Sequence, residues 1–264
     1  MNNAIGVFDS GVGGLTVARE IMRQLPNETI YYFGDVKNCP YGDKEKEEII
    51  VNTEKAIKYL INQGVKMIIL ACNTATAAAL DYLQDKYDLP IIGVVQPGAR
   101  RAIQATENNK VLVLGTKFTT TSRVYDIEIE NINSDIVVFD KACPSFVPFI
   151  ESEGYLNKNE ADIIISETLK DTINLGMDTV VLGCTHYPIL KKDIEQYYGN
   201  EIKVISSGRE AAREVSTVLG YAKLHQNKVN KTEHKFFISE KSDNFNNIAS
   251  KWLKQSIRAE IVDI

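Results

Sequence analysis

Two short apolar runs that each end at a cysteine constrain the fold of this chain more than any other feature. The first run, residues 67–74, reads MIILACNT, and the second, residues 179–186, reads TVVLGCTH. Each run is too short for a helix and lacks polar alternation, which is typical of a strand buried on both faces of a parallel sheet. Cys72 and Cys184 are then expected at the carboxyl ends of their strands, where open α/β sheets bind ligands. We therefore expect two thiols, one from each half of the chain, to face one pocket.

Strand-like and helix-like segments alternate along all 264 residues of the chain. Besides the two runs above, strands are expected at residues 4–8, 29–33, 90–95, 111–114, 136–139, 202–205 and 235–239, with one more closing the chain. Helical patterns are clearest at residues 15–25, 44–63, 74–86, 158–175, 208–219 and 245–254. This alternation predicts an α/β fold with a doubly wound parallel sheet in each half. The halves, residues 1–95 and 97–206, share their layout, so the fold is expected to be pseudo-symmetric.

Composition and charge exclude several classes of protein. Apolar residues make up 44% of the chain and charged residues 25%, as in soluble globular proteins, and no apolar run could span a bilayer. The N-terminus lacks the plan of a signal peptide, so we expect a cytoplasmic protein. The net charge of −5 argues against nucleic acid as the main partner. The 4 cysteines and 3 histidines show no clustered spacing, so no metal is expected.

The first expected strand is followed by a glycine-rich turn, DSGVGG at residues 9–14, and then by a helical pattern. Backbone amides at such a turn and at the start of a helix can hold an anion. The turn lacks the Gly-Lys-Ser/Thr of a phosphate-binding loop and the spacing of a dinucleotide-binding loop. We therefore interpret it as an amide-rich turn for a carboxylate, with Asp9 beside it.

Several of these features also have a purely structural interpretation. A cysteine at a strand end is commonly a small buried hydrophobic residue, and we keep that interpretation for Cys39 and Cys143. Asn73 and Thr74 lie near the start of a helix, where capping is their ordinary role. Residues 38–43, which contain a proline and a glycine, are expected to form a turn.

Two thiols in matching places suggest proton transfer on opposite faces of one carbon. A thiolate is a competent base, and a helix that begins after each cysteine favours the ionised form. One thiol would remove a proton and the other would deliver one, with Asp9 and His186 as assisting groups. A scaffold of two similar halves suits a reaction between mirror images. The alternative is a cysteine hydrolase, in which Cys184 is the nucleophile and His186 its base.

Four motifs in order along the chain resemble those of the bacterial glutamate racemases, in the aspartate/glutamate racemase family. The motifs are GVFDSGVGG at residues 6–14, PYG at 40–42, ACNTA at 71–75 and GCTHYP at 183–188. The resemblance covers residues 5–255 and includes a C-terminal helix with Phe245, Trp252 and Leu253. Any one motif alone is weak evidence, but four in order are specific.

The resemblance implies interconversion of L- and D-glutamate without a cofactor, which supplies D-glutamate for peptidoglycan and thus for cell wall biogenesis. It implies that Cys72 and Cys184 are the two acid/base residues, each working on one enantiomer. Asp9 would assist near Cys72 and His186 near Cys184, with Glu151 orienting His186. The implied substrate contacts are Asp9, Ser10, Tyr41, Gly42, Asn73, Thr74, Thr119 and Thr185.

The resemblance also implies two α/β domains with the active site between them. The first would comprise residues 1–96 and 207–264, with the C-terminal segment packing back, and the second residues 97–206. A homodimer is expected. Thr76 stands where the family favours serine, and we expect it not to touch the acid/base pair. An aspartate or hydantoin racemase of the same family is the nearest alternative.

Overall fold

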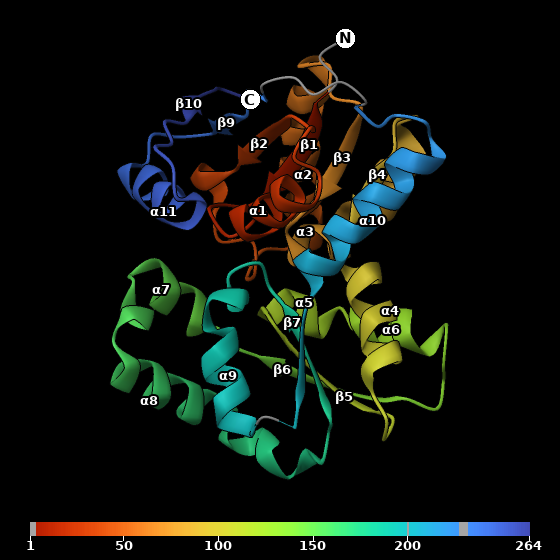
Figure 1. Cartoon of the computed structure of the whole chain (residues 1–264), viewed down its shortest axis with the longest axis vertical. Helices are drawn as coiled ribbons and strands as arrows, with labels where there is room; N and C mark the ends of the chain where they lie inside the picture. The colour runs from red at the N-terminus through yellow and green to blue at the C-terminus, as the bar shows by residue number, and fades with distance from the viewer. Residues whose placement is uncertain (1–3, 200, 227–231) are drawn as a thin grey trace. The chain divides into compact units, whose positions relative to one another are not determined.

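Ten strands form two wholly parallel sheets in the computed structural model, which describes residues 4–199, 201–226 and 232–264. Each sheet belongs to one of two compact units (Figure 1). Unit 1 comprises Met1–Val94 and Gly208–Ile264, and unit 2 comprises Val95–Ser207. The parallel sheets and their covering helices confirm the predicted α/β fold class.

The six-stranded sheet of unit 1 has the strand order β10-β9-β2-β1-β3-β4. Its strands are β1 (Ile5–Asp9), β2 (Ile30–Gly34), β3 (Met67–Leu70), β4 (Ile91–Gly93), β9 (Lys235–Ile238) and β10 (Glu260–Ile261). Every residue of β1, β2 and β3 is buried, which explains why these strands read as continuous apolar runs rather than as alternating patterns. The C-terminal segment extends the sheet, because β9 pairs with β2.

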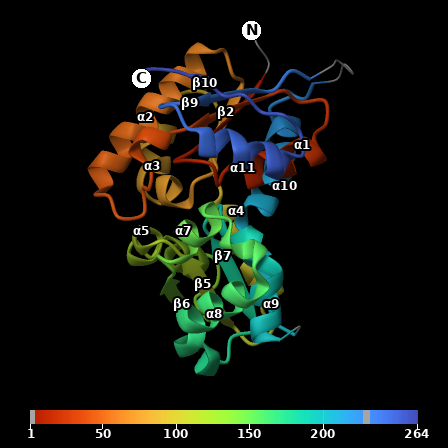
Figure 2. The ribbon, with the colours of Figure 1, turned by 90° about the vertical axis from the view of Figure 1, so that its left-hand side faces the viewer.

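Helices cover both faces of the unit 1 sheet. They are α1 (Leu15–Gln24), α2 (Lys46–Asn62), α3 (Asn73–Lys86), α10 (Ser207–Tyr221) and α11 (Asp243–Leu253). An edge-on view places α2 and α3 on one side and α1, α10 and α11 on the other (Figure 2). In α2 the buried residues Ile49, Ala56, Ile57 and Leu60 recur at helical spacing and form the stripe that faces the sheet.

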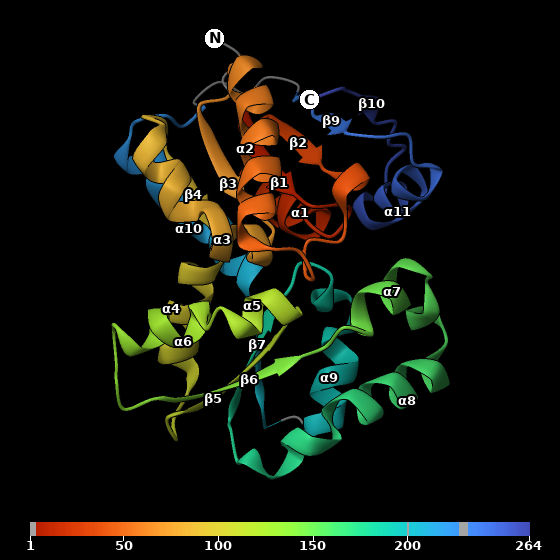
Figure 3. The same ribbon diagram turned by 180° about the vertical axis from the view of Figure 1, so that it is seen from behind.

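Unit 2 contains a four-stranded sheet of order β6-β5-β7-β8. Its strands are β5 (Lys110–Gly115), β6 (Val137–Ala142), β7 (Thr179–Gly183) and β8 (Lys203–Ser206). Its helices are α4 (Val95–Ala105), α5 (Lys117–Thr121), α6 (Val124–Glu130), α7 (Phe146–Glu151), α8 (Lys158–Leu169) and α9 (Lys191–Tyr198). Buried side chains of α4 and α6 form one core with β5, β7 and β8, whereas α8 and α9 lie beside each other (Figure 3).

The two sheets share one topology, which confirms the predicted pseudo-symmetry. The first four strands of unit 1 run 2-1-3-4, and the strands of unit 2 run 6-5-7-8, so β3 corresponds to β7. β3 pairs with β1 and β7 pairs with β5, in both cases the strand that opens the half. The segments after β1 and β3 therefore lie at the carboxyl ends of the strands of the first sheet, and those after β5 and β7 lie at the corresponding ends in the second.

Two helical segments differ from the sequence expectation. Helix α4 was not predicted, because Pro97 and Gly98 interrupt its pattern, yet proline is tolerated in a first helical turn. Gly98 allows close packing, since a Cβ there would lie 3.0 Å from Ser207 Cβ and 3.2 Å from the Tyr125 ring. The helix predicted at 158–175 tightens into a 3₁₀ helix at Lys170–Leu175. Another 3₁₀ helix, Tyr187–Leu190, precedes α9.

Among residues 4–199, 201–226 and 232–264, we find no helix with both the length and the apolar character that crossing a membrane requires.

Candidate functional site

Cys72 joins the end of β3 to the start of α3. Its side chain caps this helix, because Cys72 Sγ accepts a hydrogen bond from the Ala75 N–H at 3.4 Å. Asn73 and Thr74, for which capping was the structural interpretation, are instead the first two buried residues of the helix. A sulfur at a helix N-terminus is exposed to the positive end of the helix dipole, which stabilises negative charge on that atom.

The predicted partners of Cys72 lie on the neighbouring turn, which follows β1. Cys72 Sγ lies 3.7 Å from Ser10 Oγ, and only 6% of Cys72 is exposed. Asp9 is fully buried, and its Oδ1 accepts a hydrogen bond from the Gly11 N–H at 3.0 Å. At least one amide of the glycine-rich turn is thus bound by the chain itself, whereas we had interpreted the turn as a holder of an external carboxylate.

Tyr32 of β2 also holds the glycine-rich turn that follows β1. The Tyr32 hydroxyl donates a hydrogen bond to the Gly11 carbonyl at 2.7 Å. Burial, together with the nearby Asp9 and Cys72 side chains, raises the pKa of Tyr32 well above its usual value, so Tyr32 stays a phenol and a donor. Gly14 completes the turn, since a Cβ there would lie 2.5 Å from Asp9 Cβ.

Thr76 is closer to the candidate acid/base pair than the sequence suggested. Its hydroxyl lies 3.0 Å from the Leu70 carbonyl oxygen and 2.9 Å from the Cys72 carbonyl oxygen, so its single proton is shared between these two acceptors. We had expected Thr76 not to touch Cys72 or Cys184. That expectation was wrong, because the Thr76 hydroxyl contacts the backbone carbonyl of Cys72. Thr76 links the end of β3 to the first turn of α3 and so fixes the turn that carries the thiol.

Tyr41 and Gly42 lie on a loop between β2 and α2. Tyr41 is 1% exposed, and its hydroxyl donates to Asp35 Oδ2 at 2.6 Å. Burial and the Asp35 carboxylate raise the pKa of Tyr41 well above its usual value. This loop packs against the Ser10 turn, because the position of a Cβ on Gly11 lies 3.1 Å from Cys39 Sγ.

In unit 2, Cys184 follows β7 and the turn after it brings His186 back to the sulfur. Cys184 Sγ lies 3.9 Å from His186 Nδ1, so these side chains meet although they are only two residues apart. On the other side of the ring, His186 Nε2 lies 2.9 Å from Glu151 Oε1 at the end of α7. The three side chains form a row of thiol, imidazole and carboxylate.

His186 is held in its charged form by its two neighbours. Burial opposes the charge on this 4% exposed side chain, but hydrogen bonds to Cys184 and Glu151 outweigh burial and raise the pKa of His186 from 6.5 to about 10. An imidazolium beside Cys184 stabilises negative charge on the sulfur.

Glu151→Gln is expected to lower the pKa of His186, because the variant loses one of the two interactions that raise it. The folded pKa exceeds the ordinary value, so protonation of His186 stabilises the fold fully below pH 6.5, and this contribution is lost as the pH rises towards about 10. In the variant this contribution is smaller, and its loss is complete at a lower pH. NMR titration of the His186 ring protons measures the change, with Asp162→Asn as control. An unchanged His186 midpoint would contradict the role of Glu151.

The other predicted contacts of unit 2 follow β5 and β7. Thr119 is 1% exposed at the start of α5, where Thr116 caps the helix and its Oγ1 lies 3.0 Å from Thr119 Oγ1. Thr185 is buried between Cys184 and His186 in sequence. The structure thus places Thr119 and Thr185 at the same edge of the sheet as Cys184.

Tyr187 has a positioning function that the sequence analysis missed. Its buried hydroxyl lies 3.0 Å from the carbonyl of Gly115, the last residue of β5, and 3.0 Å from the carbonyl of Cys143, which follows β6. Burial raises its pKa well above the usual value, which keeps the donor protonated. Tyr187 therefore ties the turn after Cys184 to the ends of two neighbouring strands. Its partners are 72 and 44 residues away in sequence, so no local pattern could have revealed it.

Cys143 and Cys39 are the two cysteines for which we predicted the role of a small buried hydrophobic residue. Cys143 is fully buried, and burial raises the pKa of its thiol to about 12, which confirms the interpretation as a buried hydrophobic residue. Cys39 is only half-buried, contrary to that interpretation, because it lies on a loop. Within the described parts of the chain, no three His, Cys, Asp or Glu side chains are grouped as a metal ion would require.

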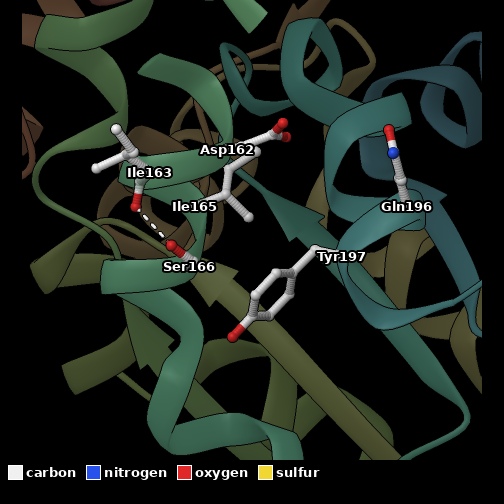
Figure 4. Close-up of a pocket in the computed structure, with 6 residues that line it drawn as sticks. All are labelled: Asp162, Ile163, Ile165, Ser166, Gln196 and Tyr197. Atoms are coloured by element: carbon white, nitrogen blue, oxygen red, sulfur yellow. Dashed lines mark hydrogen bonds between the residues drawn. The ribbon is translucent and has the colours of Figure 1, made fainter. Parts of the chain in front are cut away.

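A cavity of about 400 Å³ lies elsewhere in unit 2, where α8 faces α9 (Figure 4). It is lined by Asp162, Ile163, Ile165, Ser166, Gln196 and Tyr197. The Ser166 hydroxyl donates to the Ile163 carbonyl at 2.9 Å within α8. None of the predicted site residues lines this cavity, so it is separate from both thiol sites.

Comparison with known proteins gives consistent results. Residues 5–215 match the model of the Asp/Glu/hydantoin racemase family. A glutamate racemase of Staphylococcus haemolyticus is 48% identical over 100% of this chain and 99% of the relative. A glutamate racemase isoform of Bacillus anthracis has a similar structure, with a TM-score of 0.93, 37% identity and coverage of 99% of this chain and 98% of that one. The glutamate racemase of Francisella tularensis in complex with D-glutamate gives a TM-score of 0.92, 34% identity and the same coverage.

Proposed function

The chain belongs to the Asp/Glu/hydantoin racemase family and is therefore an isomerase, and from this premise we propose that it interconverts L- and D-glutamate. The proposal is supported by the 48% identity to a glutamate racemase over the whole chain. The solved relative from Francisella tularensis, which holds D-glutamate, supports the same substrate.

The observation that carries the proposed chemistry is the matched pair of thiols. Cys72 and Cys184 follow corresponding strands of two sheets with one topology, and each is 6% exposed. Each thiol has its own source of positive charge, which is the N-terminus of α3 for Cys72 and His186 for Cys184. Two acid/base groups of the same kind suit a substrate and a product that are mirror images.

In the proposed reaction, one thiolate takes the Cα proton of glutamate and the other thiol protonates the opposite face of the same carbon. Each enantiomer is thus deprotonated by a different cysteine. The bond that breaks is Cα–H, its electron pair stays on the carbon, and the new C–H bond uses the proton of the second thiol. Asp9 assists near Cys72, and His186, oriented by Glu151, assists near Cys184.

The carbanion is the difficult species in this reaction, because the proposal includes no pyridoxal phosphate to delocalise its charge. Fixed donors must therefore stabilise the charge electrostatically as it develops. We assign this task, and the binding of the substrate's carboxylates and ammonium, to polar groups at the two thiol sites. These groups are Asp9, Ser10, Tyr41, Gly42, Asn73, Thr74, Thr119 and Thr185.

The same proposal assigns the enzyme a place in the cell. D-Glutamate formed in the cytoplasm would supply peptidoglycan synthesis, and the enzyme would act as a homodimer. Neither a metal nor an organic cofactor enters the proposed reaction.

Circular dichroism of the purified protein with L-glutamate, and separately with D-glutamate, tests the function without added cofactor. We expect the optical signal to decay to zero from both sides, because the equilibrium constant between mirror images is one. A signal that decays with aspartate but not with glutamate would replace the substrate and keep the chemistry. If neither amino acid racemises and a covalent acyl-enzyme forms on Cys184, the cysteine hydrolase would be the better assignment.

A further inference from the structure

A fully buried carboxylate, Asp35, lies beside the Cys72 site and has no part in the proposed proton transfer. Asp35 Oδ2 accepts the hydroxyl of Tyr41 at 2.6 Å, and Oδ1 accepts the hydroxyl of Ser239 at 2.7 Å. Asn38 Nδ2 lies 3.0 Å from both carboxylate oxygens and donates to them. Neutral donors thus saturate the carboxylate, which is what a buried charge requires.

Ser239 brings the C-terminal segment into this cluster. It directly follows β9, and its backbone N–H donates to the Gly34 carbonyl at 3.3 Å. Its hydroxyl oxygen also accepts the Lys37 N–H at 3.0 Å while it donates to Asp35. Ser239 and Asp35 are 204 residues apart in sequence. One serine therefore fixes the start of the loop that leads to Tyr41.

Asp35 connects this loop to the turn that carries Ser10. The Asp35 N–H donates to the Asp9 carbonyl at 3.0 Å. Farther along the loop, Cys39 packs against Gly11 of the same turn. Asp35 therefore links the two segments: its backbone N–H holds the turn with Asp9 and Ser10, and its carboxylate holds Tyr41 in the loop.

We propose that Asp35 is a positioning residue for the Cys72 site and that Ser239 acts through it. The pair holds the loop of residues 35–42 in the one arrangement that presents Tyr41 and Gly42 to the substrate. The C-terminal segment thereby contributes to the site without touching the substrate. This inference rests on the proposed function and extends it to two residues with no acid/base task.

The kinetic test compares Ser239→Ala and Asp35→Asn with the wild type. A displaced binding loop weakens the substrate complex and the transition state equally, so KM rises while kcat stays within about threefold. We expect KM to rise about tenfold in Ser239→Ala and about 30-fold in Asp35→Asn, because small misplacements of this kind cost up to about 10²-fold. Ser239→Thr keeps the hydroxyl and should restore KM to within about threefold.

Ser250→Ala is the matched control, since its hydroxyl accepts the Ile257 N–H at 2.9 Å in the same C-terminal segment but does not contact the loop. Urea midpoints of all variants are measured alongside. A rise in KM that does not follow the loss of stability excludes general destabilisation as its cause. For every variant, kcat/KM must be equal for L- and D-glutamate, because the equilibrium constant is one. Wild-type KM in both Ser239→Ala and Asp35→Asn would overturn the inference.

A second readout does not depend on racemase activity. Iodoacetamide labels exposed thiolates, and mass spectrometry separates the labelled peptides of Cys72 and Cys184. Loosening of the loop should raise the labelling rate of Cys72 several-fold in Ser239→Ala, with Cys184 as an unchanged control in the same molecule. If the wild type proves inactive on glutamate, the proposed function fails while this readout still decides the inference. Equal labelling of Cys72 in wild type and variant would contradict it.

Discussion

Cys72→Ser and Cys184→Ser are each expected to abolish steady racemisation, with kcat lowered by about 10³-fold, within the range that general acid–base catalysis contributes. A serine hydroxyl at the start of α3 or beside His186 does not ionise near neutral pH as a thiol can. Loss of either thiol stops both directions, since each turnover needs one base and one acid. Rates of circular dichroism decay from both enantiomers measure the effect.

The control for the thiol variants is Cys143→Ala. Cys143 is a fully buried thiol of unit 2 whose pKa is raised to about 12 by burial, so it has no acid/base task near neutral pH. We expect this variant to keep its activity per folded molecule. If Cys72→Ser and Cys184→Ser both retained the wild-type rate, the two-thiol mechanism would be wrong.

Lys66→Met is expected to cause the largest loss of stability in unit 1, about 3–5 kcal/mol, which is typical when one partner of a buried ion pair is removed. Lys66 Nζ lies 2.6 Å from Glu28 Oε2, and the two side chains are only 5% and 3% exposed. The ammonium group also donates to the Leu224 carbonyl at 2.6 Å. Without Lys66, the buried Glu28 carboxylate keeps the Gln226 N–H at 2.8 Å but loses its ammonium partner, and the segment after α10 loses an anchor.

Urea unfolding measures this loss, with Lys58→Met as the matched control. Lys58 pairs with Glu54 at 2.8 Å, but its side chain is 57% exposed, and a surface pair of this kind contributes about 1 kcal/mol or less. Lys66→Met combined with Glu28→Gln should recover part of the stability, because the buried charge is removed. Lys66 precedes β3 whereas Cys72 follows it, so activity per folded molecule should persist. Equal midpoints for Lys66→Met and Lys58→Met would contradict the prediction.

The strands that carry the thiols could be predicted because their signal is local. β3 and β7 are buried on both faces, so each appears in the sequence as an uninterrupted apolar run that ends at the functional cysteine. Helix α4 escaped prediction for the opposite reason. Pro97 and Gly98 weaken its local propensity, and packing against Tyr125 and Ser207 overrides that weakness.

Candidate site residues could be located from motifs, but their contacts could not. The meeting of Cys184 with His186 depends on a particular turn, which spacing alone does not specify. Ser239 and Tyr187 were missed as positioning groups because their partners are distant in sequence. Sequence patterns therefore predict which strand ends carry the chemistry, while the hydrogen bonds that orient the side chains become visible only in the fold.

Racemisation of L-glutamate in D₂O tests the central claim, that two different thiols act on opposite faces of Cα, most directly. Thiols exchange their protons with solvent, so a protein equilibrated in D₂O carries deuterium on the thiol that delivers. Early in the reaction, the account predicts that D-glutamate contains deuterium at Cα while the recovered L-glutamate retains protium. A single base would return the abstracted proton to either face, so early D-glutamate that retains protium, or recovered L-glutamate that has gained deuterium, would contradict the account.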